Sequence, residues 1–205
     1  MRATHRNFWL LTALAAIGFL WVFGCPAGNF WGKITLTVCG LCTASIVVAG
    51  VPWRHTDLTL AEGLIGVAAA VALYGLFWAG YALACRLFDF APQQVNAIYA
   101  IRGAGHPWLI GALLLLVTSP GEELFWRGFV QRQAAKRWGA TTGVVLGTTF
   151  YGAVHLVSGN LMLVLAASVA GLFWCALYRW RGNLTACMVS HALWTVGIFL
   201  FFPIR

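Results

Sequence analysis

Charged residues are scarce in this sequence. Asp, Glu, Lys and Arg together make up 9% of the 205 residues and only five residues are acidic, whereas 61% are hydrophobic and the mean hydropathy is +0.82. One soluble core of a chain of this length cannot bury so much apolar surface, which excludes an ordinary soluble domain. The composition predicts an integral membrane protein whose apolar side chains face the lipid bilayer.

The apolar residues gather in runs of about 20, the length that an α-helix needs to cross the hydrocarbon layer. No internal repeat, low-complexity tract or linker divides the chain, so we predict a single membrane domain over 1–205. The expected fold is all-α, a polytopic bundle of about seven (six to eight) transmembrane helices. The polar gap 86–106 is expected to form a loop or an interfacial helix. The predicted spans are 8–24, 32–50, 61–85, 107–126, 141–158, 160–178 and 184–203.

Basic residues outnumber acidic ones and give a formal net charge of +8. They are scattered along the chain rather than grouped on a soluble scaffold, so we expect no nucleic-acid partner. With the predicted spans, nine Lys and Arg fall on the side of the N-terminus and four on the opposite side. The positive-inside rule therefore predicts a cytoplasmic N-terminus and an external C-terminus. The short loops and the N-terminal positive charges are typical of a bacterial inner-membrane protein.

Two of the five acidic residues, Glu122 and Glu123, are adjacent at the end of an apolar span, where ionisable groups are costly. The same argument selects His155, late in the fifth span, and His191, in the seventh. Glu123 and Arg127 are four residues apart, acid before base, and can pair on one helix face. Glu122 then points about 100° away from Glu123 and is left as the free carboxylate.

A structural interpretation of Glu122 competes with the functional one. The run Ser119-Pro120-Gly121-Glu122 fits a capping box, in which Ser119 is the N-cap, Pro120 takes the first helical position and Glu122 closes back on the cap. A proline and a glycine at this depth would interrupt the span and free backbone groups, which is tolerated where protein or a water-filled cavity receives them.

The depth of His155 raises a second question. A straight helix from residue 141 would carry His155 about 20 Å into the membrane at ~1.5 Å per residue, whereas Glu122 and His191 fall in the cytoplasmic half. We expect the fifth span to begin later than 141, because Gly143 and Gly147 weaken the start of the helix. The alternative is a site deep in the membrane.

A carboxylate and imidazoles in an apolar setting can hydrolyse an amide in two ways. Glu122 can activate a water while a histidine orients it or stabilises charge. Alternatively, Glu122, His155 and His191 can bind zinc and leave a fourth position for water. The sequence lacks HExxH, and we favour a mechanism that needs no cofactor, with zinc as the alternative. A proton relay or transporter ranks lowest, because repeats and paired broken helices are not detected.

The motifs resemble those of the CPBP family (CAAX protease and bacteriocin-processing) of glutamate-dependent intramembrane proteases, which includes the Rce1-type CAAX prenyl endopeptidases. Glu122, Glu123 and Arg127 match the family's EExxxR motif. The family's FxxxH corresponds to Tyr151–His155, with Tyr in place of Phe, and its HxxxN corresponds to 191–195, with Thr195 in place of Asn. The motif-bearing catalytic core is expected over about 107–203.

The resemblance implies a helical core with a cavity open toward the cytoplasmic side, in which Glu122 activates water with help from His155. His191 and Thr195 would stabilise the oxyanion. It implies an endopeptidase that cleaves a membrane-associated or lipidated protein or peptide, and it predicts no particular oligomeric state. Since Tyr151 and Thr195 depart from the family's residues, the alternative is a catalytically inactive binding or immunity-type scaffold of the same fold.

Overall fold

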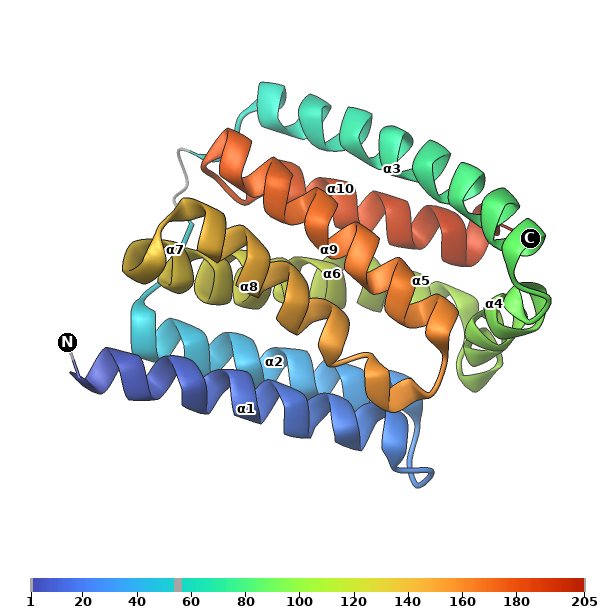
Figure 1. Cartoon of the computed structure of the whole chain (residues 1–205), viewed down its shortest axis with the longest axis horizontal. Coiled ribbons are helices and arrows are strands. Elements are labelled where there is room, and N and C mark those ends of the chain that lie inside the picture. The colour runs from blue at the N-terminus through green and yellow to red at the C-terminus, as the bar shows by residue number, and fades with distance from the viewer. Residues whose placement is uncertain (1, 54–56, 205) are drawn as a thin grey trace.

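A computed structural model describes residues 2–53 and 57–204, which form helices joined by short turns (Figure 1). Six helices are long and apolar enough to cross a membrane, and a seventh, shorter one follows them. The all-α membrane bundle of about seven helices is thereby confirmed. The six are α1 (Arg2–Gly24), α2 (Phe30–Ala49), α3 (Leu60–Leu87), the run Pro107–Trp138, α8 (Ala140–Ala153) with its extension to Ser158, and α9 (Leu161–Arg181). The seventh comprises α10 (Thr185–Val196) and the π-helical turn η6 (Gly197–Phe201).

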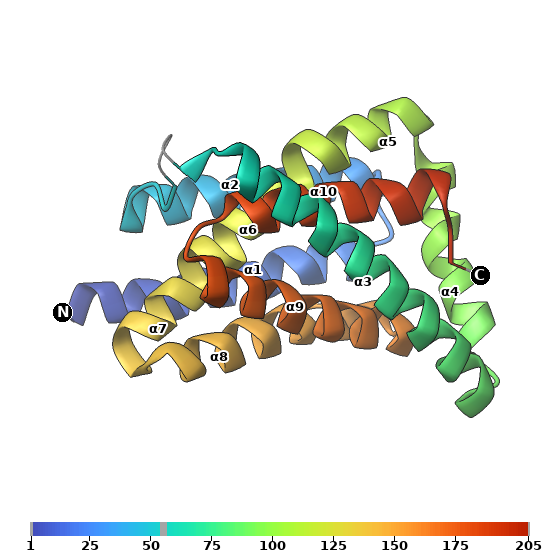
Figure 2. The same cartoon turned by 90° about the horizontal axis from the view of Figure 1, so that it is seen from above.

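The helix Pro107–Trp138 lies in the middle of the bundle, between the pair α1 and α2 and the pair α3 and α10 (Figure 1). Helix α10 packs along α3, α8 packs along α9, and α1 packs along α2. The two chain ends lie at opposite ends of the bundle (Figures 1 and 2). An odd number of crossings gives this arrangement.

Polarity is arranged as expected for a protein in lipid. Large apolar side chains such as Leu36, Val71 and Leu116 are exposed on the flanks. The interior instead holds polar side chains, among them Glu123, Arg127, Gln131, Ser190 and His191. Since polar groups at membrane depth face the bundle interior or a cavity, this pattern supports an integral membrane protein.

The central helix continues well past its predicted end at residue 126. It consists of α5 (Pro107–Leu113), the π-helical turn η3 (Leu114–Thr118), α6 (Ser119–Phe125), the π-helical turn η4 (Trp126–Gln131) and α7 (Arg132–Trp138). Arg127 and Gln131 do not end the span, because both are buried and hydrogen-bonded inside the bundle. Arg127, which the charge count placed in a cytoplasmic loop, is therefore an interior residue.

The capping box is wrong. Thr118 and Ser119 have helical backbone angles, no side-chain cap bond starts α6, and Ser119 Oγ has no hydrogen-bond partner within the described residues. The π-helical turn η3 ends at Thr118, two residues before Pro120. Because its wider turn makes room where a proline ring would collide with the preceding turn, the helix passes through Pro120 without interruption.

The expected late start of the fifth span is also wrong. Helix α8 begins at Ala140, and Gly143 and Gly147 serve close packing: a Cβ on either would lie 3.0 Å or less from a heavy atom of a neighbouring helix. His155 follows Ala140 by about 15 residues, and Glu122 precedes Trp138 by about 16 residues, or ~24 Å of helix. Both groups therefore lie far from the end of the bundle that carries the N-terminus.

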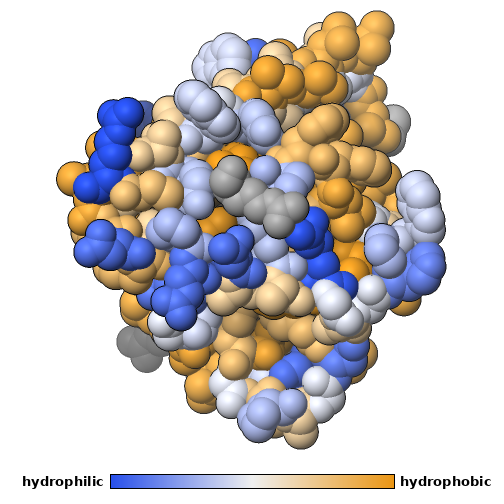
Figure 3. Space-filling model, turned by 90° about the vertical axis from the view of Figure 1, so that its right-hand side faces the viewer, coloured by the Kyte–Doolittle hydropathy of each residue, from blue (hydrophilic) through white to orange (hydrophobic). Residues whose placement is uncertain are grey.

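The polar gap 86–106 forms a short helix, α4 (Ala91–Ala100), and a 3₁₀ turn, η2 (Ile101–Ala104), across the end of the bundle opposite the N-terminus (Figure 2). Polar side chains gather on this end face, with apolar ones toward its margins (Figure 3). Arg102 Nη1 donates to the carbonyl of Phe199, and Asn160 Nδ2 donates to the carbonyl of Gln94. The segment is thus fixed to α9 and η6.

Candidate active site

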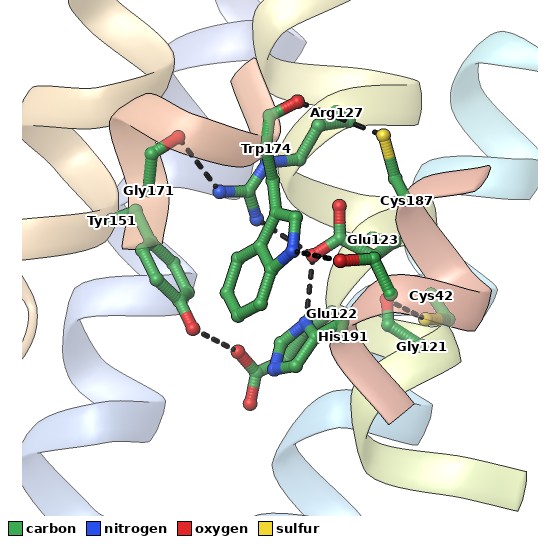
Figure 4. Close-up of polar contacts among 11 residues, drawn as sticks. Cys42, Gly121, Glu122, Glu123, Arg127, Tyr151, Gly171, Trp174, Cys187 and His191 are labelled. Carbon is green, nitrogen blue, oxygen red and sulfur yellow. Dashed lines mark hydrogen bonds and ion pairs between the residues drawn. The ribbon is translucent and has the colours of Figure 1, made fainter. Parts of the chain in front are cut away.

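Glu123 is the centre of a buried ion-pair network (Figure 4). Its Oε1 accepts a hydrogen bond from Arg127 Nη1 at 2.9 Å and another from His191 Nδ1 at 2.7 Å. Glu123 and Arg127 are both fully buried, and Arg127 Nη2 donates to the carbonyl of Gly171 at 3.1 Å. The predicted pairing of residues 123 and 127 is therefore present, and the pair joins the central helix to α9 and α10.

Aromatic rings enclose this network. The guanidinium of Arg127 lies 4.8 Å from the ring centre of Tyr151 and 5.3 Å from that of Trp174. Trp174 stacks on His191, with ring centres 3.8 Å apart, and its Nε1 donates to Ser190 Oγ. These contacts hold the buried cation against two electron-rich faces and fix the plane of the His191 ring.

Glu122 points away from the ion-pair network, as the 100° spacing of adjacent helical residues requires (Figure 4). Its Oε2 accepts a hydrogen bond from the Tyr151 hydroxyl at 2.9 Å. Within the described residues, no hydrogen bond reaches its Oε1 from another side chain. The His191 ring lies beside it, with Nδ1 turned to Glu123 (Figure 4). Glu122 thus keeps one oxygen available, whereas Glu123 is engaged by two cationic or imidazole donors.

His155 lies in the turn that follows α8. Its Nδ1 is 2.8 Å from the carbonyl oxygen of Tyr151, and because a carbonyl can only accept, Nδ1 carries the proton. The neutral ring therefore presents the lone pair of Nε2. Three aromatic rings pack against it, with ring centres 5.2 to 5.7 Å away: those of Phe19, Phe23 and Tyr151.

A cavity of about 140 Å³ connects these groups. Glu122, His155, Thr118 and Thr195 give it its polar lining. The Oγ1 of Thr195 is buried and has no hydrogen-bond partner in the part of the chain that the structure describes, so its hydroxyl is free to donate. At ~30 Å³ per water, the cavity has room for a few waters beside several polar partners.

The six predicted site residues thus fall into two groups. Glu122, His155 and Thr195 line the cavity, whereas Glu123, Arg127 and His191 form the network behind them. Over residues 2–53 and 57–204, no group of three His, Cys, Asp or Glu side chains could hold a metal ion, and this includes the set Glu122, His155 and His191 that zinc would need. The donor geometry therefore does not fit the zinc alternative.

Sequence reasoning missed the roles of Trp174 and of the Tyr151 hydroxyl. Tyr151 was noted only as a departure from the family's Phe, yet its hydroxyl is the donor to Glu122. Trp174 belongs to no motif. It lies four residues from the end of the predicted span 160–178, where Trp is common near a membrane interface, so nothing in the sequence singled it out.

Comparison with known proteins gives one match. The family model of the Rce1-like type II CAAX prenyl endopeptidases matches residues 104–197. No curated protein and no solved structure matches the chain. The matched segment carries Glu122, Glu123, Arg127, His155 and His191 in the geometry described above. Residues 104–197 of this integral membrane protein are therefore similar to the Rce1-like type II CAAX prenyl endopeptidases.

Proposed function

We propose that the chain hydrolyses a peptide bond of a membrane-associated or lipidated polypeptide by means of a water that Glu122 activates. The observation that carries this proposal is the division of labour between the two adjacent carboxylates. Glu123 is fully buried and bonds Arg127 and His191 through Oε1, away from the cavity, whereas Glu122 lines the cavity with one oxygen available. A general base must reach both a water and the substrate carbonyl, and only Glu122 of the two has this access.

His155 and Glu122 divide the task of holding the water. Nε2 of neutral His155 accepts a hydrogen bond from the water, and the available oxygen of Glu122 accepts the proton that is transferred. The hydroxide so formed attacks the carbonyl carbon of the scissile bond. The Tyr151 hydroxyl, bonded to the other oxygen of Glu122, keeps the carboxylate aimed at the cavity.

The attack places a negative charge on the former carbonyl oxygen. The free hydroxyl of Thr195 can donate to it, and a protonated His191, with Nδ1 held by Glu123, would present Nε2–H for the same purpose. Glu122 then returns its proton to the leaving nitrogen, so the C–N bond breaks and the products are a carboxylic acid and an amine. No step of this sequence uses a cofactor.

Glu123 and Arg127 act through position rather than contact with substrate. Glu123 bonds Arg127 one helical turn further along and His191 on α10, and Arg127 bonds Gly171 on α9. Three helices are thereby locked around the cavity. Glu123 and Arg127 are accordingly positioning residues, and the network also offsets the cost of burying each charge.

The test compares polypeptide ends in membranes from cells that carry the wild type, Glu122→Gln or Glu62→Gln. Glu62 is a matched control, because it is a second buried carboxylate but pairs with Arg181, away from the cavity. Terminal-peptide mass spectrometry should detect new ends with the wild type and Glu62→Gln. These ends should fall about 10²- to 10⁴-fold in rate with Glu122→Gln.

Equal processing by the wild type and Glu122→Gln would refute the proposal. If no ends depend on the protein, while Glu122→Ala complements its loss as well as the wild type does, the alternative of an inactive scaffold is correct. Metal analysis of the purified wild type and of purified His155→Ala tests the zinc alternative. Zinc bound to the wild type in a one-to-one ratio and lost in His155→Ala would establish a metalloprotease instead.

A further inference from the structure

The cavity lies at one end of the bundle. Its wall comes from the end of α1 (Phe23), the start of α2 (Phe30), the segment α4–η2 (Ile98), the start of α9 (Leu163) and the end of α10 and η6 (Phe199). All of these lie at the end opposite the N-terminus, where α4 and the C-terminus are found (Figures 1 and 2).

The other side of the site is closed. From Phe125 to Gln131 every residue of the central helix is buried, and the neighbouring side chains of Trp174, Cys175 and Cys187 are at 0% exposure. This packed layer fills the space between Glu122 and the end that carries the N-terminus. Over the described residues, the cavity that Glu122 lines is therefore closed on this side by packed side chains, and its lining extends to the end that carries α4.

The positive charges mark the opposite end. Lys136 and Arg179 are exposed there, near the α7–α8 turn and the end of α9. At the end that carries α4, Lys33 is buried and its Nζ donates to the carbonyl of Cys25, while Arg102 donates to the carbonyls of Tyr99 and Phe199. Cations at the other end are engaged as well, since Arg181 pairs with Glu62 and Arg132 donates to the carbonyl of Ala49. The asymmetry between the ends is therefore that of the sequence count, which becomes eight against four once the interior Arg127 is left out.

We infer that the active-site cavity opens on the non-cytoplasmic side of the membrane. The positive-inside rule assigns the end with the N-terminus to the cytoplasm, and the cavity opens at the other end. This differs from the family-based expectation of a cavity open toward the cytoplasm. That expectation and a cytoplasmic N-terminus cannot both hold for this bundle.

The inference defines the substrate class and rests on the proposed function. The substrate is an exported polypeptide, or the outer end of a membrane-anchored one, whose scissile bond lies at the external face. The cavity is lined mainly by apolar side chains, including Phe19, Trp31 and Ile101. The residues that flank the bond are therefore apolar, and a prenylated protein confined to the cytoplasmic leaflet does not reach the site.

Cysteine labelling tests the side of the cavity without any need for activity. In a parent whose cysteines 25, 39, 42 and 85 are replaced by alanine, single cysteines are introduced as Gly103→Cys, Ile98→Cys and Lys136→Cys. Gly103 is exposed on η2 with open space at its Cβ, Ile98 lines the cavity and Lys136 is exposed at the opposite end. Intact spheroplasts are then treated with a membrane-impermeant maleimide, before and after permeabilisation.

Labelling of Gly103→Cys and Ile98→Cys in intact spheroplasts, with Lys136→Cys labelled only after permeabilisation, is the expected result. The reverse pattern would overturn the inference. Labelling of Gly103→Cys alone, with Ile98→Cys protected throughout, would refute an open cavity at this end.

A second experiment tests the substrate class. One apolar cleavage segment, taken from an end identified in the processing test, is fused so that it lies at the external or the cytoplasmic face. Cleavage confined to the external fusion and lost in Glu122→Gln supports the inference, whereas cleavage of the cytoplasmic fusion alone overturns it. Failure of the proposed function appears separately, as processing that does not depend on Glu122 while the labelling pattern is unchanged.

Discussion

Glu122 and Glu123 are adjacent and chemically identical, yet their conversion to Gln should have opposite effects. Glu123→Gln leaves the fully buried Arg127 without a counter-ion. Removing one partner of a buried pair costs about 3–5 kcal/mol, because the other charge stays buried without compensation. Glu122→Gln keeps an oxygen that can accept from the Tyr151 hydroxyl, and a single hydrogen bond in a membrane bundle contributes only about 0.6 kcal/mol.

We therefore expect Glu123→Gln to lower the free energy of unfolding by several kcal/mol and Glu122→Gln to lower it by less than about 1 kcal/mol. Reversible unfolding in mixed micelles, with denaturing detergent as the variable, measures both values. The change in tryptophan fluorescence is a suitable signal, because Trp126 and Trp174 are buried beside the network. Activity should show the opposite order, with Glu122→Gln inactive and well folded.

A double-mutant cycle with Arg127→Met isolates the pair. If the two charges stabilise each other, Glu123→Gln combined with Arg127→Met should cost less than the sum of the single changes, by about 1–3 kcal/mol. Equal destabilisation by Glu122→Gln and Glu123→Gln, or strictly additive energies in the cycle, would refute the assignment of one carboxylate to structure and the other to the cavity.

Three further predictions concern the cavity and the packing. His155→Ala should lower kcat about 10²- to 10⁴-fold, and a kcat within threefold of the wild type would contradict its role in holding water. Thr195→Val keeps the shape of the side chain but removes the free hydroxyl, so kcat should fall about 10²-fold while KM changes little. Gly66→Ala should destabilise the bundle by about 1–3 kcal/mol, because its Cβ would lie 2.6 Å from Val189, whereas Gly63→Ala, with open space at its Cβ, should be neutral or stabilising in the same unfolding assay.

The fold class could be predicted because the bilayer imposes a length and a polarity on each span, and both are readable from the sequence. The end of the central helix could not. Arg127 and Gln131 look like the end of a span, but both have partners on α9: Arg127 donates to the carbonyl of Gly171, and Gln131 donates to the carbonyl of Cys175. A charged or polar residue ends a span only if nothing in the folded protein satisfies it. The sequence does not show which residues of distant helices come into contact, so these partners could not be predicted.

Local signals misled the interpretation around Pro120 for a related reason. Ser119 and Pro120 carry the signature of a helix start, since a cap and a missing N–H suit the first turn. The structure instead accommodates the ring and the missing N–H of Pro120 inside a continuous helix, by means of a π-helical turn at 114–118. In this turn Thr118 Oγ1 donates to the carbonyl of Leu113. A π-turn has no strong sequence signature, and so the choice between a new helix and a bulged one depends on packing.

The carboxylates could be singled out from the sequence, and the structure explains why the pair must be adjacent. Glu123 is fixed by bonds to Arg127 on its own helix and to His191 on α10, so the rotation of the central helix about its axis is set at this turn. Glu122, one residue earlier, is then held about 100° around the same helix, facing the cavity. Glu123 cannot serve as the base, because it is fully buried beside Arg127 and does not line the cavity. With two adjacent glutamates, one neutralises the buried Arg127 and the other carries out the chemistry. Moving either glutamate by one residue along the helix would place the free carboxylate in the packed core.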